Sequence, residues 1–189
     1  DERIIPNGQY RDAMNIQVST SDGADVGTVQ NILGNTEENT LDVDGTSTTI
    51  VTAGYECVGS IADERNDAIY SFITTNDGVA GTHTSAIVEY KKTDTATGVV
   101  TVITPVLVDT DNSVLKFEHG DIITGINIID DLLFWTDGVN EPKKINITSF
   151  KKNNHTDLNT HSHLFVNGTT TNVNVAEDHI TVIKKKPLK

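Results

Sequence analysis

The chain has 189 residues, and its 14 lysine and arginine residues against 27 aspartate and glutamate residues give a formal net charge of −13 at pH 7. This charge excludes binding to nucleic acid through bulk basicity, because an acidic surface repels a polyanion. The single cysteine, Cys57, excludes an internal disulfide and a cysteine zinc cluster, and we expect it to be a small buried apolar residue. No apolar run approaches the roughly 18 residues that a membrane-spanning helix requires, so we predict no such segment.

Residues 1–49 are predicted to form an extended N-terminal arm and linker. Alternating apolar residues predict a short strand at 16–19, and residues 26–33 predict a second extended segment. This part has too few apolar side chains for a core of its own, so we expect it to lie along the rest of the fold or along a neighbouring subunit. The stretch from Arg3 to Val18 is our prediction for an inter-subunit or adaptor contact.

From residue 50 onward the chain has the pattern of β-strands. Val, Ile, Thr and aromatic residues dominate short runs bounded by acidic residues, Asn or Gly, and no window of 11 or more residues has a helical period. We therefore predict an all-β fold. The expected strands are 50–53, 55–62, 67–74, 85–92, 98–108, 114–118, 122–129, 132–136, 143–147, 163–166, 172–175 and 179–184.

Residues 50–149 contain two similar units, each with an apolar strand, an acidic turn, an aromatic strand, a loop and an alternating strand. Repeats of about 40–50 residues with several strands each are typical of β-propeller blades, so we predict two propeller-type blades of a partial β-propeller. At least about four blades close a ring, so the others would come from outside this chain, or the fold is an open sandwich. Residues 150–178 are predicted to be a polar insertion with a hairpin.

Residues 179–189 are predicted to be a final strand and a linker to a missing C-terminal part. The chain begins without methionine and ends in a segment that contains proline. We therefore expect it to be the N-terminal part of a longer protein.

Four histidines, His155, His161, His163 and His179, suggest a metal site. No predicted helix presents them and no glutamate stands at a metalloprotease spacing, so we favour surface histidines in a polar loop.

Two aspartate-rich segments, Asp109-Thr-Asp111-Asn-Ser113 and Asp42-Val-Asp44-Gly45, resemble the start of a calcium loop. Both lack the third acidic position and the closing glutamate of an EF-hand. We favour ordinary turns, because Asp side chains cap their own turns.

A catalytic apparatus is not predicted. The sequence has no Gly-x-Ser-x-Gly elbow and no phosphate-binding glycine loop followed by lysine. The paired carboxylates, which are Glu37-Glu38, Asp63-Glu64 and Asp130-Asp131, are expected in solvated turns. We therefore predict a protein that is not an enzyme, with no catalytic, cofactor-binding or metal-binding residues and no cofactor.

The only tryptophan, Trp135, follows Phe134 in a predicted strand, so the two rings face opposite sides of one sheet. We favour packing between blades for this pair over an aromatic platform for a ligand.

Residues 3–18 and 25–35 resemble the start of virion structural proteins of short-tailed bacteriophages, most closely the tail nozzle, or packaged-DNA stabilisation, proteins. Residues 124–137, 140–146 and 177–185 are similar to the same proteins. The resemblance implies a component of the virion tail that forms a homo-oligomeric ring of six copies under the portal and adaptor. Such a ring lines the DNA exit channel and retains packaged DNA, which passes without sequence-specific binding.

The residues leave two other functions open. One is an extracellular propeller-type adhesion or glycan-binding module, with sugar contacts from Trp135 or Tyr70. The other is a hydrolase on a propeller scaffold, which would need carboxylates or histidines that converge at the central channel.

Overall fold

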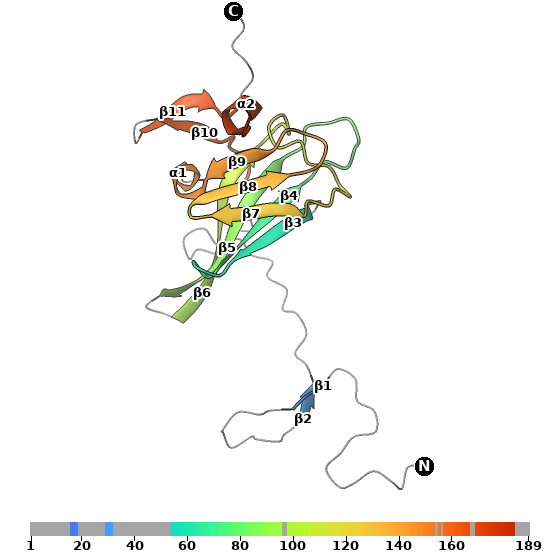
Figure 1. Cartoon of the computed structure of the whole chain (residues 1–189), viewed down its shortest axis with the longest axis vertical. Helices are drawn as coiled ribbons and strands as arrows, with labels where there is room; N and C mark the ends of the chain where they lie inside the picture. The colour runs from blue at the N-terminus through green and yellow to red at the C-terminus, as the bar shows by residue number, and fades with distance from the viewer. Residues whose placement is uncertain are drawn as a thin grey trace, which may run out of the picture. The chain divides into compact units, whose positions relative to one another are not determined.

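The structure, a computed structural model, describes residues 16–18, 29–31, 54–95, 98–153, 155, 157–166 and 169–183, and Figure 1 shows its elements. The chain divides into two compact units, Asp1–Glu38 and Asn39–Lys189. In the smaller unit, β1 (Ile16–Val18) and β2 (Val29–Asn31) pair antiparallel, which confirms the two predicted extended segments. Most of the predicted contact segment Arg3–Val18, the Asp42-Val-Asp44-Gly45 segment, the strand at 50–53 and the boundary at 49 fall outside the described residues.

A four-stranded antiparallel sheet begins the larger unit. Its strands β3 (Glu56–Asp63), β4 (Ala68–Thr74), β5 (Ser85–Thr95) and β6 (Gly98–Asp109) follow one another in space as they do in the chain. The first turn is closed by Asp63, whose Oδ1 accepts the backbone N–H groups of Arg65 and Asn66. Asp63 is also buried, so the expectation of a solvated carboxylate at this position is wrong.

A three-stranded antiparallel sheet follows, with β7 (Gly125–Ile129), β8 (Leu132–Thr136) and β9 (Lys143–Asn146) in chain order. The β7–β8 turn has Asp130 at a φ of 54°, a left-handed conformation that Asp tolerates better than most residues. Asn146 then caps the short helix α1 (Ile147–Lys151), because its side chain accepts the N–H of Ser149.

The last elements are the hairpin of β10 (His163–Val166) with β11 (Thr169–Asn174) and the helix α2 (Glu177–Ile180). The predicted strand at 179–184 is wrong for residues 179–183, which the structure describes: α2 occupies its start, and of these residues Thr181 alone forms a β-bridge, to Lys143. Glu177 and Asp178 favour a helix here, since acidic residues in the first turn complement the helix dipole. Regular strands still dominate the described residues, and the all-β class is confirmed.

The predicted strand at 114–118 is also wrong. Asn112 and Lys116 have φ values of 54° and 58°, which break an extended backbone, and the Asp109 carboxylate binds the N–H groups of Val114 and Leu115. The segment is a compact turn with buried apolar side chains, so its β-like composition reflects burial and not strand pairing.

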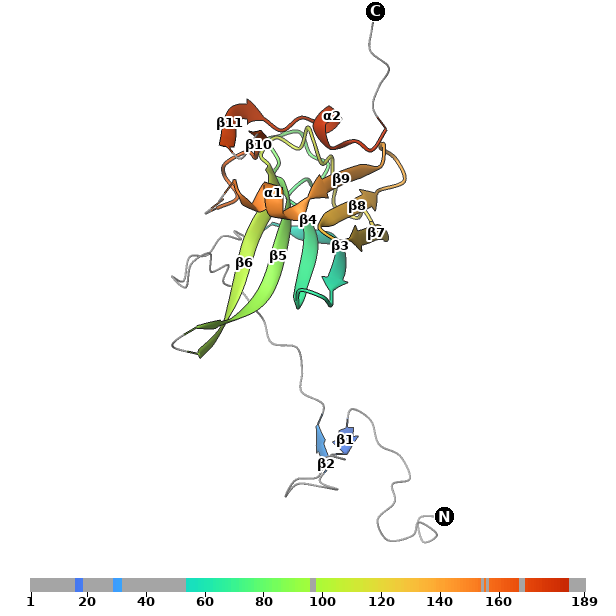
Figure 2. The same cartoon turned by 60° about the vertical axis from the view of Figure 1, so that its left-hand side comes forward.

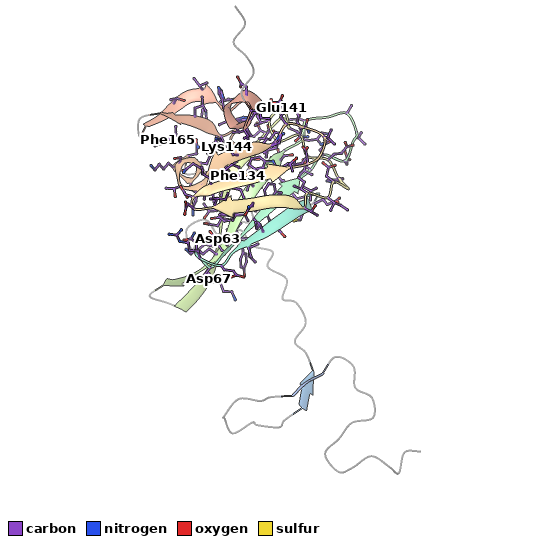
Figure 3. All side chains as sticks on the ribbon, viewed as in Figure 1. Asp63, Asp67, Phe134, Glu141, Lys144 and Phe165 are labelled. Carbon is purple, nitrogen blue, oxygen red and sulfur yellow. The ribbon has the colours of Figure 1, made fainter. Side chains whose placement is uncertain are left out.

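The main apolar core lies between the two sheets. Buried residues of β4, β5 and β6 meet buried residues of β8 and β9 there, among them Tyr70, Phe72, Ile87, Leu107, Leu133, Trp135 and Ile145. Because β7 contacts β3 and α1 contacts β6, the three-stranded sheet and α1 together extend across the four-stranded sheet from one edge to the other (Figures 1 and 2). Trp135 thus packs between the sheets as predicted, whereas Phe134 is half-buried on the outer face of β8, next to Lys144 of β9 (Figure 3).

The opposite face of the four-stranded sheet carries a second, smaller apolar cluster of Ile73, Ala86, Val88, Ile103, Val108 and Leu158. Ile69, also on this face, remains 43% exposed. Cys57 is exposed, and the expectation that it is buried is wrong, because β3 is the edge strand of its sheet and Val58 points to the core instead.

Candidate functional site

The turn that follows β6 holds a carboxylate in an unusual environment. Asp109, the last residue of β6, has no exposed surface, and its Oδ2 accepts the N–H groups of Val114 at 2.8 Å and Leu115 at 2.7 Å. Asp111 likewise accepts the N–H of Ser113 at 3.2 Å. The predicted turn-capping role of these aspartates is confirmed, but Asp109 performs it from inside the protein.

The second oxygen of the Asp109 carboxylate, Oδ1, has no hydrogen-bond partner. Within the part of the chain that the structure describes, it and Trp135 Nε1 are the buried side-chain nitrogen or oxygen atoms that lack one. The atom that faces Asp109 Oδ1 is Nδ1 of His161, 3.8 Å away. A buried polar atom without a partner is rare and destabilising. In this carboxylate only Oδ1 is such an atom, because Oδ2 accepts two backbone N–H groups.

The tautomer of His161 follows from its other nitrogen. Nε2 lies 3.0 Å from the carbonyl oxygen of Val175, which can only accept, so Nε2 carries a hydrogen. In the neutral ring, Nδ1 then presents a lone pair, and the backbone N–H of Thr110 lies 3.4 Å from it. The Nδ1 lone pair of His161 therefore accepts the Thr110 N–H, and Asp109 Oδ1 lies 3.8 Å from this nitrogen.

Asp111 completes a group of three. One ligand atom from each of Asp109, Asp111 and His161 can be chosen so that all lie within 4.8 Å of one another. Burial raises the pKa of Asp109, and the neighbouring Asp111 carboxyl raises it further, against the lowering effect of the N–H groups of Leu115 and Val114. The pKa of Asp111 is lowered, first by the hydrogen bond from Ser113 and then by the neighbouring Asp109 carboxyl group. The pair can hold a shared proton or a shared cation.

Hydrogen bonds attach the segment before β10 to the end of β6. The N–H of Val108 donates to Ser162 Oγ at 2.9 Å, and the N–H of Ser162 donates to the Val108 carbonyl oxygen at 2.9 Å. His155 Nε2 lies 2.8 Å from the same hydroxyl group. These bonds fix the position of His161 opposite Asp109.

The prediction that the histidines are surface residues is wrong for His155, which is 6% exposed. Burial lowers the pKa of His155 to about 4, because the charged imidazolium is disfavoured inside the protein. The side chain of His161 is 10% exposed. His161 precedes β10, whereas His163 is the first residue of that strand. His179 is exposed and accepts the N–H of Ala176 at the start of α2.

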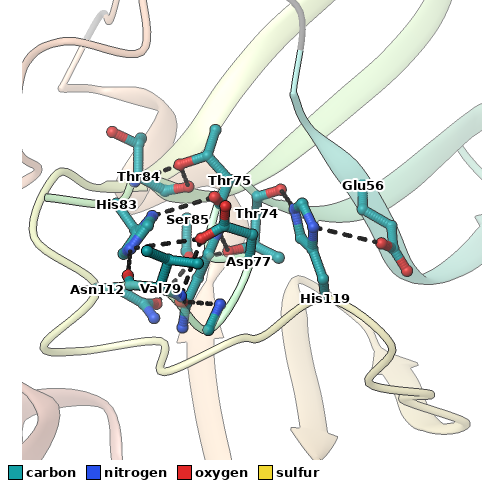
Figure 4. A network of polar contacts seen from close by, with 12 residues as sticks. Glu56, Thr74, Thr75, Asp77, Val79, His83, Thr84, Ser85, Asn112 and His119 are labelled. Atoms are coloured by element: carbon teal, nitrogen blue, oxygen red, sulfur yellow. Dashed lines mark hydrogen bonds and ion pairs between the residues drawn. The ribbon is translucent and has the colours of Figure 1, made fainter. Parts of the chain in front are cut away.

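A second polar network holds the turn from the other side (Figure 4). Ser85 on β5 donates a 2.6 Å hydrogen bond to Asn112 Oδ1 and lies 2.8 Å from the hydroxyl group of Thr74. His119 Nε2 lies 3.2 Å from the Thr74 carbonyl oxygen, and its Nδ1 faces Glu56 at 3.6 Å. The ends of β4 and β5 therefore anchor the turn that carries Asp109 and Asp111.

A buried lysine marks a further polar cluster, around α2. Lys143 is 1% exposed, and its Nζ lies 3.5 Å from Glu177 and 4.0 Å from Asp137. Lys116 also pairs with Glu177. Burial acts to raise the pKa of Glu177, but the hydrogen bond and charge of Lys116, together with Lys143, lower it overall. A cleft of about 430 Å³ beside this cluster is lined by Lys116, Val139, Asn140, Glu141, Glu177, Asp178 and Thr181.

The two aromatic residues that a glycan-binding module would use are inaccessible. Trp135 and Tyr70 are each 2% exposed. The Tyr70 hydroxyl group donates to Glu89 Oε1 at 2.7 Å, while Lys151 binds Glu89 Oε2 at 2.6 Å. The predicted sugar contacts from these rings are therefore wrong, because both rings are core residues.

Among the described residues, no helix is long and apolar enough to cross a bilayer.

The fold and its polar groups define a class of protein. It is an all-β protein of two packed antiparallel sheets, with buried polar side chains that bind turns and strand ends. A family model, that of the crassvirus muzzle protein, matches residues 1–184, and the chain belongs to this family. Family membership confirms that the protein is a structural component of a phage virion, as the resemblance implied. No curated protein and no solved structure matches the chain.

Proposed function

We propose that the protein is a ring-forming subunit of the phage tail, of the nozzle type, which lines the DNA exit channel and retains packaged DNA. The observation that carries this proposal is the match to the muzzle protein family over residues 1–184. The role is mechanical and requires neither catalysis nor a cofactor.

The charge of the chain supports a channel wall. At a net charge of −13, the surface repels the phosphate backbone, so DNA can move past it without adhering and without sequence-specific contacts. The antiparallel ladders of the two sheets give the wall a rigid backbone, since every inner strand is hydrogen-bonded on both sides.

The outer face of the four-stranded sheet supports assembly. It carries a second apolar cluster, and Ile69 on this face is 43% exposed beside its register partner Tyr90. We propose that another propeller-type blade, either of the same protein or of a neighbouring subunit, packs on this face. Six copies would form the ring, and the segment Arg3–Val18 would contact a neighbouring subunit or the portal and adaptor proteins.

The test is the assembly state of the purified protein, measured by light scattering with size-exclusion chromatography and by negative-stain electron microscopy. We expect rings of six copies for the natural sequence and smaller species for Ile69→Asp, because a charge cannot be buried at a blade interface without a partner. Val139→Asp is the matched control, since Val139 is 88% exposed in the β8–β9 loop. A natural sequence that stays monomeric at all concentrations and does not join a ring with the portal and adaptor proteins would refute the proposal.

A further inference from the structure

We propose that Asp109, Asp111 and His161 bind one divalent transition-metal ion of the zinc type at the end of β6. This inference concerns the stability of the subunit and does not depend on the proposed role in the tail.

The first argument is the unpartnered oxygen. Asp109 is completely buried, and its Oδ1 receives no hydrogen bond. Leaving a carboxylate oxygen in this state costs free energy, which a proton shared with Asp111 or a bound cation would offset. The neighbour of this oxygen is another electron-pair donor, His161 Nδ1, at 3.8 Å. A positive ion between the two atoms would bind both of them.

The second argument is the orientation of the ligands. A metal-binding histidine usually donates its other ring N–H to a carbonyl or carboxylate oxygen, which fixes the tautomer. His161 does this, with Nε2 3.0 Å from the Val175 carbonyl oxygen. The Asp109 carboxylate is fixed in the same way, because its Oδ2 is bound by two backbone N–H groups at 2.7 and 2.8 Å. These contacts hold both ligands in place. Oδ1 receives no hydrogen bond and is open to an ion, whereas Nδ1 would exchange its 3.4 Å hydrogen bond from the Thr110 N–H for the bond to the ion.

The distances and the donor types indicate the kind of ion. Bonds of about 2.0–2.2 Å to a shared ion place neighbouring ligand atoms about 3–4 Å apart. The 3.8 Å between Oδ1 and Nδ1 lies in this range, and small side-chain rotations would bring in Asp111, since the three ligand atoms already lie within 4.8 Å. One imidazole nitrogen with two carboxylate oxygens favours zinc or a similar transition metal over calcium or magnesium, which prefer oxygen ligands throughout.

The site has a route for the ion. Asp111 is exposed while Asp109 is buried, so an ion can enter from solvent through Asp111 and keep a water molecule as its fourth ligand. Asp109 and Asp111 belong to the turn after β6, whereas His161 precedes the β10–β11 hairpin. The ion would therefore fasten the hairpin segment to the four-stranded sheet, at the place where Val108 and Ser162 exchange hydrogen bonds.

The experiment uses the purified chain after treatment with EDTA, with Zn²⁺ titrated by calorimetry and metal content measured by mass spectrometry. We expect one zinc ion per chain and a rise in the melting temperature on its addition. Asp111→Asn and His161→Gln should each weaken Zn²⁺ binding more than tenfold. Asp157→Asn and His163→Gln are the controls, because they remove a carboxylate and an imidazole from the same region without touching the three ligands.

Cobalt provides a second readout that does not depend on stability. Co²⁺ bound to nitrogen and oxygen ligands absorbs visible light, and the spectrum should change in His161→Gln but persist in His163→Gln. If His161→Gln fails to fold, the test rests on Asp111→Asn, because Asp111 is exposed and its substitution should not disturb folding. Zinc affinity that is equal in the natural sequence and in Asp111→Asn would overturn the proposal, and so would the absence of binding in the natural sequence. Ring formation by the metal-free protein would leave the proposed function intact in either case.

Discussion

The indole ring of Trp135 packs edge-on against the ring of Phe72, with centroids 5.6 Å apart and planes at 70°. This contact joins β8 of one sheet to β4 of the other, in the middle of the apolar core. Aromatic pairs in this geometry stabilise proteins beyond the burial of their surface. Trp135 is therefore one of the residues that join the two sheets.

We predict that Trp135→Ala lowers the free energy of unfolding by about 3–5 kcal/mol, the range found when a large aromatic residue is removed from a core. Trp135→Phe should cost less, because it keeps an aromatic edge near Phe72 and removes the indole N–H that has no hydrogen-bond partner. Urea unfolding followed by circular dichroism measures all variants. Phe134→Ala is the control and should cost about 1 kcal/mol or less; an equal effect of both substitutions would contradict the proposed core.

The buried Lys143 gives a second prediction. Lys143→Ala should destabilise the protein by about 2–4 kcal/mol, because Asp137 and Glu177 would lose a buried positive charge and the long side chain would leave a cavity. Lys144→Ala, the adjacent exposed residue, should change stability by less than about 0.5 kcal/mol. Thermal unfolding of the two variants at the same pH makes the comparison, and it would fail if Lys144 proved as important as Lys143.

Gly59 is predicted to be intolerant of any side chain. A Cβ atom at this position would lie 2.7 Å from the backbone oxygen of Ile123, next to the hydrogen bond between the Ile123 N–H and the Val58 carbonyl oxygen. Gly59→Ala should therefore cost about 1–3 kcal/mol, since the backbone must move. Gly81→Ala serves as the control, because its nearest neighbour would be the His83 ring at 3.6 Å, an ordinary van der Waals distance. Denaturant midpoints that shift equally would rule out the close approach as the cause.

His155 predicts a dependence of stability on pH. Its pKa falls from an ordinary value of 6.5 to about 4 in the folded protein, so the unfolded chain binds a proton first as the pH decreases. His155 therefore contributes no penalty above about pH 6.5 and an increasing penalty as the pH falls from there towards 4, amounting to about 1–3 kcal/mol near pH 4.5. Burial is the main cause, with the charges of His163 and His161 adding to it and Asp157 opposing it.

The measurement compares urea unfolding of the natural sequence with that of His155→Gln at pH 7 and pH 4.5. The variant should lose less stability between the two pH values, because it has no group to protonate at this position. Every other titrating group is common to the two proteins, so parallel pH profiles would show that His155 does not titrate as the structure implies.

Local pattern predicted some of the strands with their observed bounds. The predicted ranges 132–136 and 163–166 coincide with β8 and β10, and alternation in β8 correctly separated the inner Trp135 from the outer Phe134. The same reasoning placed a strand at 114–118, where a side chain outside the segment, Asp109, binds the backbone and turns it. Alternation reports which side chains are apolar, but it does not report which polar group will bind a backbone N–H.

The sequence did not predict the candidate site, for the same reason. Asp109 and Asp111 had the composition of a turn, and His161 had the composition of a polar loop, with nothing in either segment to indicate that they meet. The histidines of residues 155–163 and the aspartates of residues 109–111 each suggested metal ligands, but neither segment pointed to the other. Family resemblance did not help either, because it concerned the function of the whole chain.

By itself, the sequence determined the all-β class, the negative charge and the family to which the chain belongs, because composition, alternation and motif are properties of residues near one another in the chain. Only the tertiary structure decided that Trp135 joins two sheets, that Cys57 is exposed and that His155 is buried. It also placed His161 opposite the unpartnered oxygen of Asp109. Burial and hydrogen bonding between distant segments depend on how the sheets pack, and packing is set by contacts that no local pattern contains.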